Sequence, residues 1–368
     1  MNQQQDALLG DIKVLIEQAR HTAARSINTL QVRVNFEIGR RIVEEEQRGA
    51  NRAKYGTQLL RFLAEELTTA FGTGFSHRNL DYMRKFFLTY RDRLAPISQK
   101  PSAKSGAPKI EQKASAESLP TAAESHLPPQ SNAFYLSWSH YVFLIAIKNA
   151  EERRFYEIES AQNDWSLPEL RRQFDSGLYE RLALSRDKAG VLALSQQGQL
   201  VAKPVDVIKN PYVLEFLGLD EQSRYSESDL ESAIISKIEH FLLELGKGFL
   251  FEARQKRFTF AEEHFFVDLV FYNRLLRCYV LIDLKLGKLT HQNLGQMQMY
   301  VNYFDRFVKQ ENENRTIGII LCKEKTDALV EITLPPDANI HAAEYQLYLP
   351  SKAELQQQLN EWLAESPA

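Results

Sequence analysis

Apolar residues recur every three or four positions through most of residues 1–90, and this spacing places side chains on one face of an α-helix. The pattern predicts helices over residues 5–48, 55–70 and 76–90. Glycines in the segment 71–75 favour a helix stop and a turn, and Ser76 is suited to cap the helix that follows. We therefore expect an all-α N-terminal region.

The helical periodicity disappears over residues 94–132, where six prolines are mixed with Ser, Ala, Lys and Gln. This composition predicts a disordered linker or insertion. Helical patterning returns over residues 133–204, where Ser166 and Glu169 have the spacing of a capping box. We therefore expect the helical N-terminal region to continue after the linker.

From residue 205 to 368 the pattern changes to a mixture of helices and strands, which predicts an α/β domain with a mixed central sheet. The expected order is a helix at 228–245, strands at 249–259, 264–272 and 277–286, a helix at 291–308, strands at 316–322 and near 344–349, and a helix capped by Ser351. The whole chain is thus predicted to be an α+β multidomain protein.

Composition narrows the class of protein further. The chain is 44% hydrophobic and 25% charged with a net charge of −3, which is typical of a globular protein. It lacks the pattern of a secretory signal and any apolar run long enough to cross a membrane, so we expect a cytoplasmic protein. Cys278 and Cys322 each lie alone in an apolar run, which argues against a zinc site.

Two acidic residues and a lysine interrupt otherwise apolar strands. Asp268 lies in HFFVDLVFY, and Asp283 and Lys285 lie in CYVLIDLKLGK. Alternation along a strand puts Asp283 and Lys285 on one face. If residues 274–277 form a four-residue loop, the two strands make an antiparallel hairpin that pairs Asp268 directly with Asp283. Buried charges need partners, so this cluster predicts a site that binds a cation.

A third acid fits the same site. At 100° per residue, Glu231 lies on the apolar stripe of the helix 228–245, whereas Glu244 points outward and Glu239 lies at the edge. Carboxylates in such a group favour Mg²⁺ or Mn²⁺, which can activate water for phosphodiester hydrolysis. A simpler alternative is an Asp–Lys ion pair at a sheet edge with a solvated Glu231.

These residues resemble the YhcG-like family of PD-(D/E)XK nucleases. The match lies in Glu231, FVDLVFY and LIDLKLGKLTHQNLGQMQMYVNYFD, with Val267 where some members have proline. In the N-terminal half it lies in IGRRIVEEEQRGANRAKYG, FGTGFSHRNLDYMRKFF, LSWSHY and WSLPELRRQ. The resemblance implies a restriction-endonuclease-like domain that uses Mg²⁺ or Mn²⁺, with Asp268, Asp283 and Glu231 as metal ligands and Lys285 as a catalytic residue.

Gln296 and Tyr300 match the Q-x-x-x-Y motif of RecB-like and related nucleases. Their spacing places both on one face of the helix 291–308. The resemblance implies that Gln296 reaches the site or the scissile strand and that Tyr300 lies near nucleic acid. A Gln–Tyr pair that only packs against the sheet is the alternative.

Residues 1–93 contain a candidate DNA-recognition element. The helices 55–70 and 76–90 and the turn between them have helix-turn-helix proportions, and the resemblance implies a winged-helix-like region here. Four polar residues of the second helix are placed to meet bases or phosphates, namely Arg78, Asn79, Arg84 and Lys85. A plain helical hairpin with a solvated polar face is the alternative.

Two functions of different classes follow from the sequence. The first is a metal-dependent nuclease, with endonuclease or exonuclease action, that hydrolyses phosphodiester bonds in DNA, or in RNA by the same chemistry. Its N-terminal region would bind DNA or a partner, and a homodimer or a defence or restriction partner is compatible with it. The second is a non-catalytic nucleic-acid-binding or assembly protein that retains a nuclease fold.

Overall fold

A computed structural model describes residues 3–48, 55–93, 134–184, 188–209, 211–219, 225–260, 262–335 and 337–365. The expected linker at 94–132 lies outside these residues. The chain divides into two compact units, Met1–Arg153 and Arg154–Ala368, and the helices expected over 133–204 fall into both. In the described part of the chain, no helix is long and apolar enough to cross a membrane.

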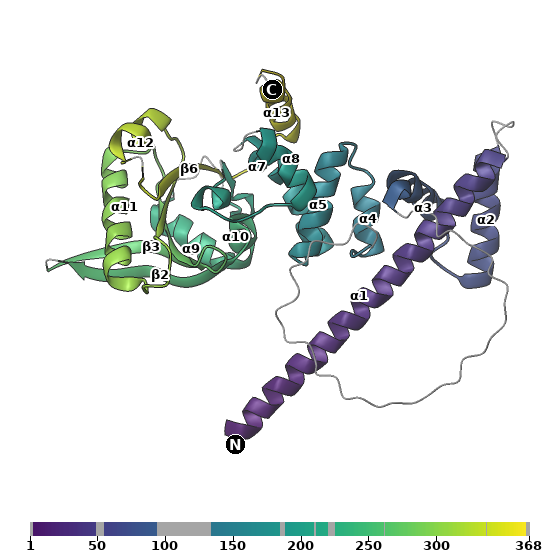
Figure 1. The fold of residues 1–368 in the computed structure, drawn as a ribbon, viewed down its shortest axis with the longest axis horizontal. Coiled ribbons are helices and arrows are strands. Elements are labelled where there is room, and N and C mark those ends of the chain that lie inside the picture. The colour runs from purple at the N-terminus through teal and green to yellow at the C-terminus, as the bar shows by residue number, and fades with distance from the viewer. Residues whose placement is uncertain are drawn as a thin grey trace. The chain divides into compact units, whose positions relative to one another are not determined.

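The first unit is helical, as predicted. It consists of α1 (Gln3–Arg48), α2 (Tyr55–Phe71), α3 (His77–Tyr90) and α4 (Trp138–Leu144), with a 3₁₀ turn at Arg91–Arg93 (Figure 1). Ser76 caps α3, because its hydroxyl accepts a hydrogen bond from the backbone N–H of Asn79. The expected helix boundaries are thus reproduced to within two residues.

Aromatic packing holds the helices of this unit together. The ring of Phe86 on α3 lies 5.0 Å from the rings of Phe134 and Tyr141, and 5.8 Å from that of Phe36 on α1. Gly39 allows α1 to approach α3 closely, because a Cβ atom there would lie only 2.0 Å from the carbonyl oxygen of Met83. The C-terminal half of α1 is therefore part of the core, while residues of its N-terminal half are exposed.

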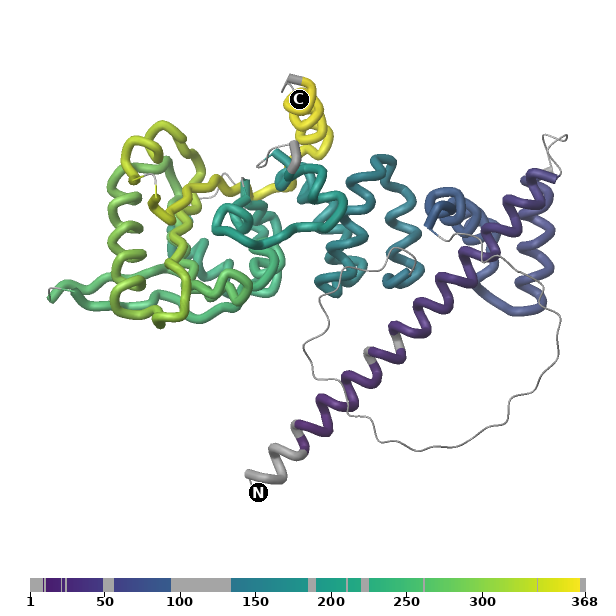
Figure 2. The backbone as a smooth tube through the Cα atoms, viewed as in Figure 1, coloured from purple at the N-terminus to yellow at the C-terminus, as the bar shows by residue number. Residues whose placement is uncertain are grey.

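The second unit combines helices with one mixed sheet. Figure 2 traces its backbone from teal to yellow. Its strands are β1 (Tyr212–Val213), β2 (Phe249–Phe260), β3 (Glu263–Asn273), β4 (Cys278–Leu284), β5 (Ile317–Cys322) and β6 (Ile340–Gln346). Its helices are α5 (Ala150–Gln162), α6 (Leu167–Asp175), α7 (Leu178–Leu184), α8 (Lys188–Gln197), α9 (Glu227–Ser236), α10 (Ile238–Leu245), α11 (His291–Tyr303), α12 (Asp327–Thr333) and α13 (Lys352–Glu365). The predicted mixed sheet is confirmed.

The strand order is β1-β6-β5-β4-β3-β2. β2, β3 and β4 pair in antiparallel fashion, whereas β4, β5, β6 and β1 are parallel. α9 and α10 pack on one face of the sheet through Leu230, Ile234 and Phe241. α11 packs on the other face through Leu294 and Met297. The sheet is therefore buried on both sides at β4 and β5.

Several expected elements differ in detail from those observed. The single helix predicted at 228–245 is broken into α9 and α10 at Lys237, whose backbone leaves the helical conformation. The helix predicted at 291–308 ends at Tyr303 and continues as a π-helical turn over Phe304–Val308. The strand predicted near 344–349 begins earlier, at Ile340, and α12 and β1 were not predicted.

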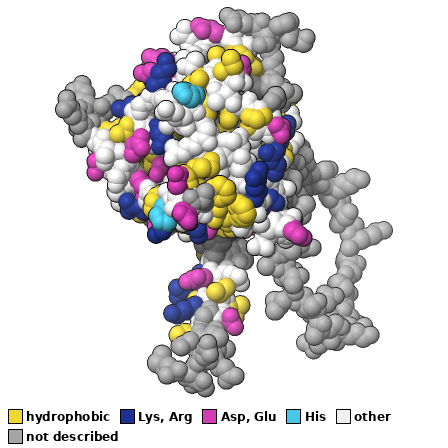
Figure 3. All heavy atoms as spheres, turned by 90° about the vertical axis from the view of Figure 1, so that its left-hand side faces the viewer, with side chains coloured by type: hydrophobic (Ala, Val, Ile, Leu, Met, Phe, Trp, Pro, Cys, Tyr) yellow, Lys and Arg dark blue, Asp and Glu magenta, His cyan; other side chains and the backbone are white. Residues whose placement is uncertain are grey.

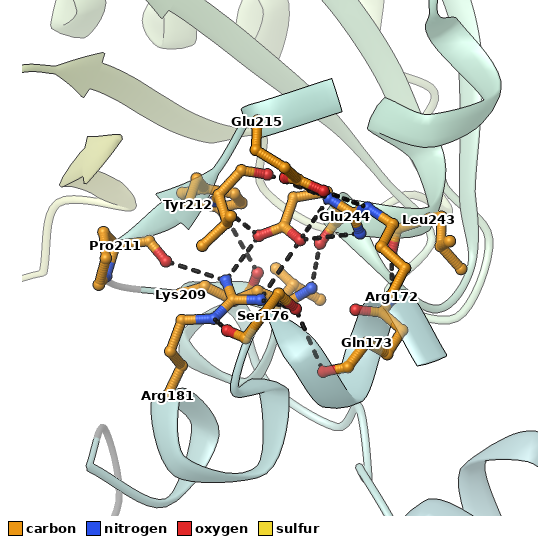
Figure 4. A network of polar contacts seen from close by, with 12 residues as sticks. Arg172, Gln173, Ser176, Arg181, Lys209, Pro211, Tyr212, Glu215, Leu243 and Glu244 are labelled. Atoms are coloured by element: carbon orange, nitrogen blue, oxygen red, sulfur yellow. Dashed lines mark hydrogen bonds and ion pairs between the residues drawn. The ribbon is translucent and has the colours of Figure 1, made fainter. Parts of the chain in front are cut away.

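Glu244 is the clearest error of the sequence analysis, because it is fully buried and does not point into solvent. α6 and α7 cover α10, and they bring Arg172 and Arg181 to the carboxylate of Glu244 (Figure 4). Arg181 Nη1 lies 2.6 Å from Glu244 Oε1, and Arg172 Nη1 lies 3.4 Å from Oε2. The backbone N–H of Val213 on β1 also donates to Oε1, at 3.0 Å. This carboxylate thus joins the helical layer to the sheet.

Electrostatics explains why this group stays ionised. Burial alone would raise the pKa of Glu244, but the charges of Arg181, Lys209 and Arg172 outweigh it and lower that pKa to about 2. Lys209 is also fully buried, and its ammonium donates to the Glu244 carbonyl oxygen. Burial lowers the pKa of Lys209 to about 8. The cluster is therefore a closed ionic network.

We predict that Glu244→Gln lowers the free energy of unfolding by about 3–5 kcal/mol, because it leaves buried guanidinium charges without their anion. Urea unfolding followed by circular dichroism measures the change. Glu239→Gln on the same helix is the control, since Glu239 is exposed, and its effect should stay within about 0.5 kcal/mol. Equal stability of the two variants would contradict a structural role for the network.

Candidate active site

The β3–β4 hairpin determines the geometry of the candidate site. Asn273 is fully buried at the end of β3, and its Oδ1 accepts hydrogen bonds from Leu275 N and Leu276 N at 3.0 and 3.1 Å. These bonds shape the four-residue turn at 274–277 that the sequence analysis considered. The resulting register pairs Leu269 with Ile282 and Asn273 with Cys278.

One step beyond the Leu269–Ile282 pair, the same register brings Asp268 opposite Asp283. Both project from the face covered by α11, because their neighbours of equal parity, Val270 and Leu281, belong to the core on that side. Leu284 N donates to Asp268 Oδ2 at 2.9 Å, which fixes the carboxylate against β4. The structure thus brings the two predicted aspartates together.

Lys285 completes the cluster. Its Nζ lies 2.8 Å from Asp283 Oδ2 and 3.5 Å from Glu227 Oε2. Asp283 is only 2% exposed. Apart from the ion pair with Lys285, its buried Oδ2 has no hydrogen-bond partner among the described residues. The site therefore holds a desolvated carboxylate oxygen with unused capacity to bind a cation.

Burial and mutual repulsion make the two carboxylates hard to ionise. Burial first, and then the charge of Asp268, raise the pKa of Asp283 to about 6, and Lys285 offsets only part of this effect. Burial also raises the pKa of Asp268, although the hydrogen bond from Leu284 N opposes it. Burial lowers the pKa of Lys285, but the charge and hydrogen bond of Asp283, together with the charges of Glu227 and Asp268, outweigh burial and raise it.

Glu231 on α9 is buried, as helix phase predicts, with 3% of its surface exposed. Its carboxylate accepts hydrogen bonds from the side chains of Arg254 and Gln255 on β2. Gln255 Nε2 also donates to Asp268 Oδ1 at 3.1 Å. Gln255 therefore links Glu231 to the aspartate pair through its amide group.

Gln255 and Arg254 were missed by the sequence analysis. Gln255 has a positive φ of 47° inside a strand, which is rare for a residue with a side chain and marks local strain at a site. It lies between the pairs Arg254–Leu269 and Lys256–Val267, and hence opposite Asp268. Strand parity, which pairs Asp268 with Asp283 in the β3–β4 hairpin, places Gln255 opposite Asp268 in the β2–β3 hairpin in the same way.

Gln296 and Tyr300 lie together on α11, as their spacing predicts. Gln296 Nε2 donates to Tyr300 Oη, and Gln296 is exposed while Tyr300 is buried. Burial raises the pKa of Tyr300, and the charges of Asp283 and Asp268 add to the effect. Tyr300 thus lies within electrostatic reach of the carboxylates, with Gln296 at the solvent side.

The residues present suit a magnesium ion, although they do not form a complete protein cage. Within the described part of the chain, no three His, Cys, Asp or Glu side chains are grouped as a metal site. Mg²⁺ retains several waters and often uses only one or two carboxylates. Asp268 and Asp283 Oδ2, which is paired with Lys285 alone among the described residues, supply ligands of that type. The donor set therefore fits a hydrated divalent ion.

The N-terminal candidates lie apart from this cluster in the sequence, and most have local partners. Asn79 bonds Gly74 O and accepts from Trp138 Nε1 at 2.8 Å. Arg84 and Lys85 both pair with Asp81, at 2.8 Å. Arg78 is exposed, and its Nε donates to Tyr82 Oη at 2.8 Å. Of the four, Arg78 is the residue most available to an external ligand.

The charge pattern of the surface is mixed. In the face that Figure 3 shows, both basic and acidic side chains are scattered among uncharged ones. The net charge of −3 agrees with this picture.

Comparison with known proteins places the chain in a family. Residues 205–360 match the model described as "YhcG PDDEXK nuclease domain", and residues 11–181 match that described as "DUF1016 N-terminal domain". "Putative nuclease YhcG" of Escherichia coli (strain K12) is 40% identical over 357 residues, which cover 94% of this chain and 91% of that protein. The chain therefore belongs to the YhcG family of PDDEXK nucleases, as the resemblance implied.

A solved structure is also similar. The repair endonuclease from Pyrococcus abyssi is 17% identical and covers 36% of this chain and 50% of its own, with a TM-score of 0.23. The restriction-endonuclease-like fold of the C-terminal domain rests on the family match over 205–360 together with the mixed sheet.

We predict that Asp283→Asn stabilises the metal-free protein near neutral pH by about 1–3 kcal/mol. The raised pKa means that the ionised form of Asp283 opposes folding. The destabilisation by ionised Asp283 has its full size at a pH above the folded-state pKa of this carboxyl, about 6, and it is absent at a pH below the ordinary pKa of an aspartate. The stability difference between wild type and variant should therefore vanish below about pH 4.

Urea unfolding across pH measures this difference, with Asp337→Asn, at an exposed position, as the control. Millimolar Mg²⁺ should raise the melting temperature of the wild type and leave that of Asp283→Asn unchanged. A variant less stable than wild type near neutral pH, or an equal response to Mg²⁺, would contradict the prediction.

Proposed function

We propose that this chain is a metal-dependent nuclease that hydrolyses phosphodiester bonds in DNA, with Asp268, Asp283 and Lys285 as its active site. The observation that carries the proposal is the buried aspartate pair on adjacent strands, which a single lysine neutralises only in part. Such a pair costs folding free energy, and binding of a cation is a function that explains its presence.

Asp268 and Asp283 would hold Mg²⁺ or Mn²⁺, and Glu231 is a further candidate ligand that Gln255 keeps beside the pair. When bound, the ion supplies a Lewis acid that polarises a phosphoryl oxygen and lowers the pKa of a water. The raised pKa of Lys285 keeps its ammonium protonated. Lys285 is thus able to donate a hydrogen bond to the attacking water or to a phosphate oxygen.

Gln296 and Tyr300 suit a role in positioning the substrate. Gln296 is exposed on α11, and its amide donates a hydrogen bond to the hydroxyl of the buried Tyr300. An amide has both a donor and an acceptor, so it can bond a phosphate oxygen or a base edge without adding charge. We propose that Gln296 orients the strand to be cut.

Asp268→Ala and Lys285→Ala should each lower the cleavage rate by about 100-fold or more, because each removes a ligand or donor of the transition state. The assay follows Mg²⁺-dependent cleavage of single-stranded DNA, duplex DNA and RNA. Lys203→Ala, at an exposed lysine of the same unit, is the matched control and should retain wild-type cleavage.

Full activity of Lys285→Ala would refute the assigned site, and cleavage of RNA alone would refute the assignment of DNA. Absence of both Mg²⁺ binding and cleavage in the wild type would favour the non-catalytic alternative.

We further propose that the first turn of α3 contributes to DNA binding through Arg78. Arg78 is exposed, and its guanidinium stacks over the ring of Tyr82 at 5.4 Å, which orients it without neutralising it. Arg84 differs, because Asp81 and Glu46 already occupy its guanidinium. The two arginines of one helix thus offer a matched pair for testing.

Arg78→Ala should weaken DNA binding and reduce the slope of log affinity against log salt by about 1, as expected for the loss of one phosphate contact. Arg84→Ala should leave that slope unchanged and lower thermal stability instead. Fluorescence anisotropy with labelled duplex, using protein that also carries Asp283→Asn to prevent cleavage, measures both. Unchanged binding by Arg78→Ala would contradict the role of α3.

A further inference from the structure

Arg254 and Gln255 on β2 depart from the alternation of a regular strand. Consecutive strand residues normally project to opposite faces, yet the Arg254 guanidinium and the Gln255 amide both donate to the carboxylate of Glu231. The positive φ of 47° at Gln255 explains this, because a left-handed residue redirects the strand locally. Glycine or asparagine adopts that conformation more easily than glutamine. The strained backbone therefore directs attention to what the glutamine side chain contacts.

The side-chain amide of Gln255 lies between two carboxylates. Its Nε2 donates to Glu231 Oε2 and, at 3.1 Å, to Asp268 Oδ1. An ionised carboxylate only accepts hydrogen bonds, so the nitrogen of the amide and not its oxygen must face the two acids. Burial is the main cause of the raised pKa of Asp268; the charge of Glu231 adds to it, whereas the hydrogen bond from Gln255 opposes it. Gln255 thus offsets the repulsion between the two acids.

The other oxygen of each acid is bonded elsewhere. Asp268 Oδ2 accepts from Leu284 N at 2.9 Å, and Glu231 Oε1 accepts from Arg254. Leu284 is fully buried in β4, so its N–H cannot turn away from Asp268 without disturbing the sheet. Gln255 differs, because its side chain is neutral and exposed and can rotate into water. It is therefore a donor that the two acids can exchange for another partner.

A purely supporting role is the competing explanation for Gln255. Donors to the outer oxygens of metal-ligating carboxylates orient those ligands and increase metal affinity. Arg254 and Leu284 N are placed to do this, since each contacts one acid alone. The amide of Gln255 instead contacts both acids through a single nitrogen. It occupies the space that they share, which favours competition with a cation over support for one.

We infer that Gln255 is a placeholder, whose amide holds Glu231 and Asp268 together in the metal-free protein and must release them before they can share a metal ion. This role rests on the proposed metal dependence of the site. The hydrogen bonds lost by Gln255 reduce the apparent metal affinity, because they stabilise the form that does not bind. Removing its donors should therefore tighten metal binding while it weakens the metal-free fold. Removal of a supporting donor would loosen metal binding instead.

Gln255→Met keeps the length of the side chain and removes its hydrogen-bond donors. It should lower the dissociation constant for Mn²⁺ about tenfold, because hydrogen bonds to charged groups no longer have to be broken. It should also lower the melting temperature of the metal-free protein. Isothermal titration calorimetry of the full chain measures the first change, and circular dichroism with a chelator present measures the second.

Two further variants make the comparison specific. Gln255→Asn tolerates the left-handed backbone, but its amide is one methylene shorter and should not reach both acids, so it should bind Mn²⁺ more tightly than wild type as well. Gln358→Met is the matched control, because it makes the same chemical change at an exposed position on α13. It should alter neither the affinity nor the melting temperature.

The amide itself provides a readout that does not depend on cleavage. In proton–nitrogen correlation spectra, the side-chain signal of Gln255 is the one that Gln255→Met removes. Saturation with Mg²⁺ should move this signal towards the position of a solvated glutamine amide, because the bonds to Glu231 and Asp268 are lost. A supporting residue would keep its bonds, and its signal would stay away from the solvated position.

The outcomes separate the placeholder from the metal site on which it depends. Equal or weaker Mn²⁺ binding by Gln255→Met and Gln255→Asn, with binding by wild type intact, would overturn the placeholder and leave the proposed nuclease site standing. An amide signal that does not approach the solvated position at saturating Mg²⁺ would overturn it as well. If neither wild type nor the two variants bind Mn²⁺, the metal-dependent site itself is refuted, and the placeholder with it.

Discussion

The register between β3 and β4 is the constraint on which the candidate site depends. Asn273 fixes it by holding the turn at 274–277 through two backbone hydrogen bonds. A slip of one residue would move Asp268 to the face of α9 and α10, away from Asp283 and from α11. It would also bring Leu269 and Phe271 out of the core on that face. The apolar core therefore enforces the same register that the carboxylates need.

Two buried carboxylates in the second unit show opposite responses to burial. Glu244 is surrounded by Arg181, Arg172 and Lys209, and its pKa falls to about 2. Asp283 has a second carboxylate and one lysine beside it, and its pKa rises to about 6. The first environment satisfies its charge within the chain, so the group is structural. The second leaves negative charge that the neighbouring lysine balances only in part, as the raised pKa of Asp283 indicates.

Much of this arrangement could be predicted from the sequence, because it depends on local periodicity. Strand parity placed Asp268, Asp283 and Lys285 together, and helix phase identified Glu231 as buried. Glu244 could not be placed in this way. Its direction depends on the break at Lys237 and on α6 and α7, which cover α10 from a distant part of the chain. Periodicity describes one element and contains no information about which other element covers it.

β2 forms the edge of the sheet, and its irregularities have a consequence for solubility. An edge strand of 12 residues offers unpaired backbone groups to any other extended chain, and so invites aggregation. Here the register shifts between Phe251 and Ala253, and Gln255 adopts a left-handed conformation. Both features interrupt the regular row of backbone donors and acceptors along β2. The charged residues Arg254 and Lys256 lie on either side of Gln255. The distortion that carries Gln255 to Asp268 therefore also protects the sheet from adding a foreign strand.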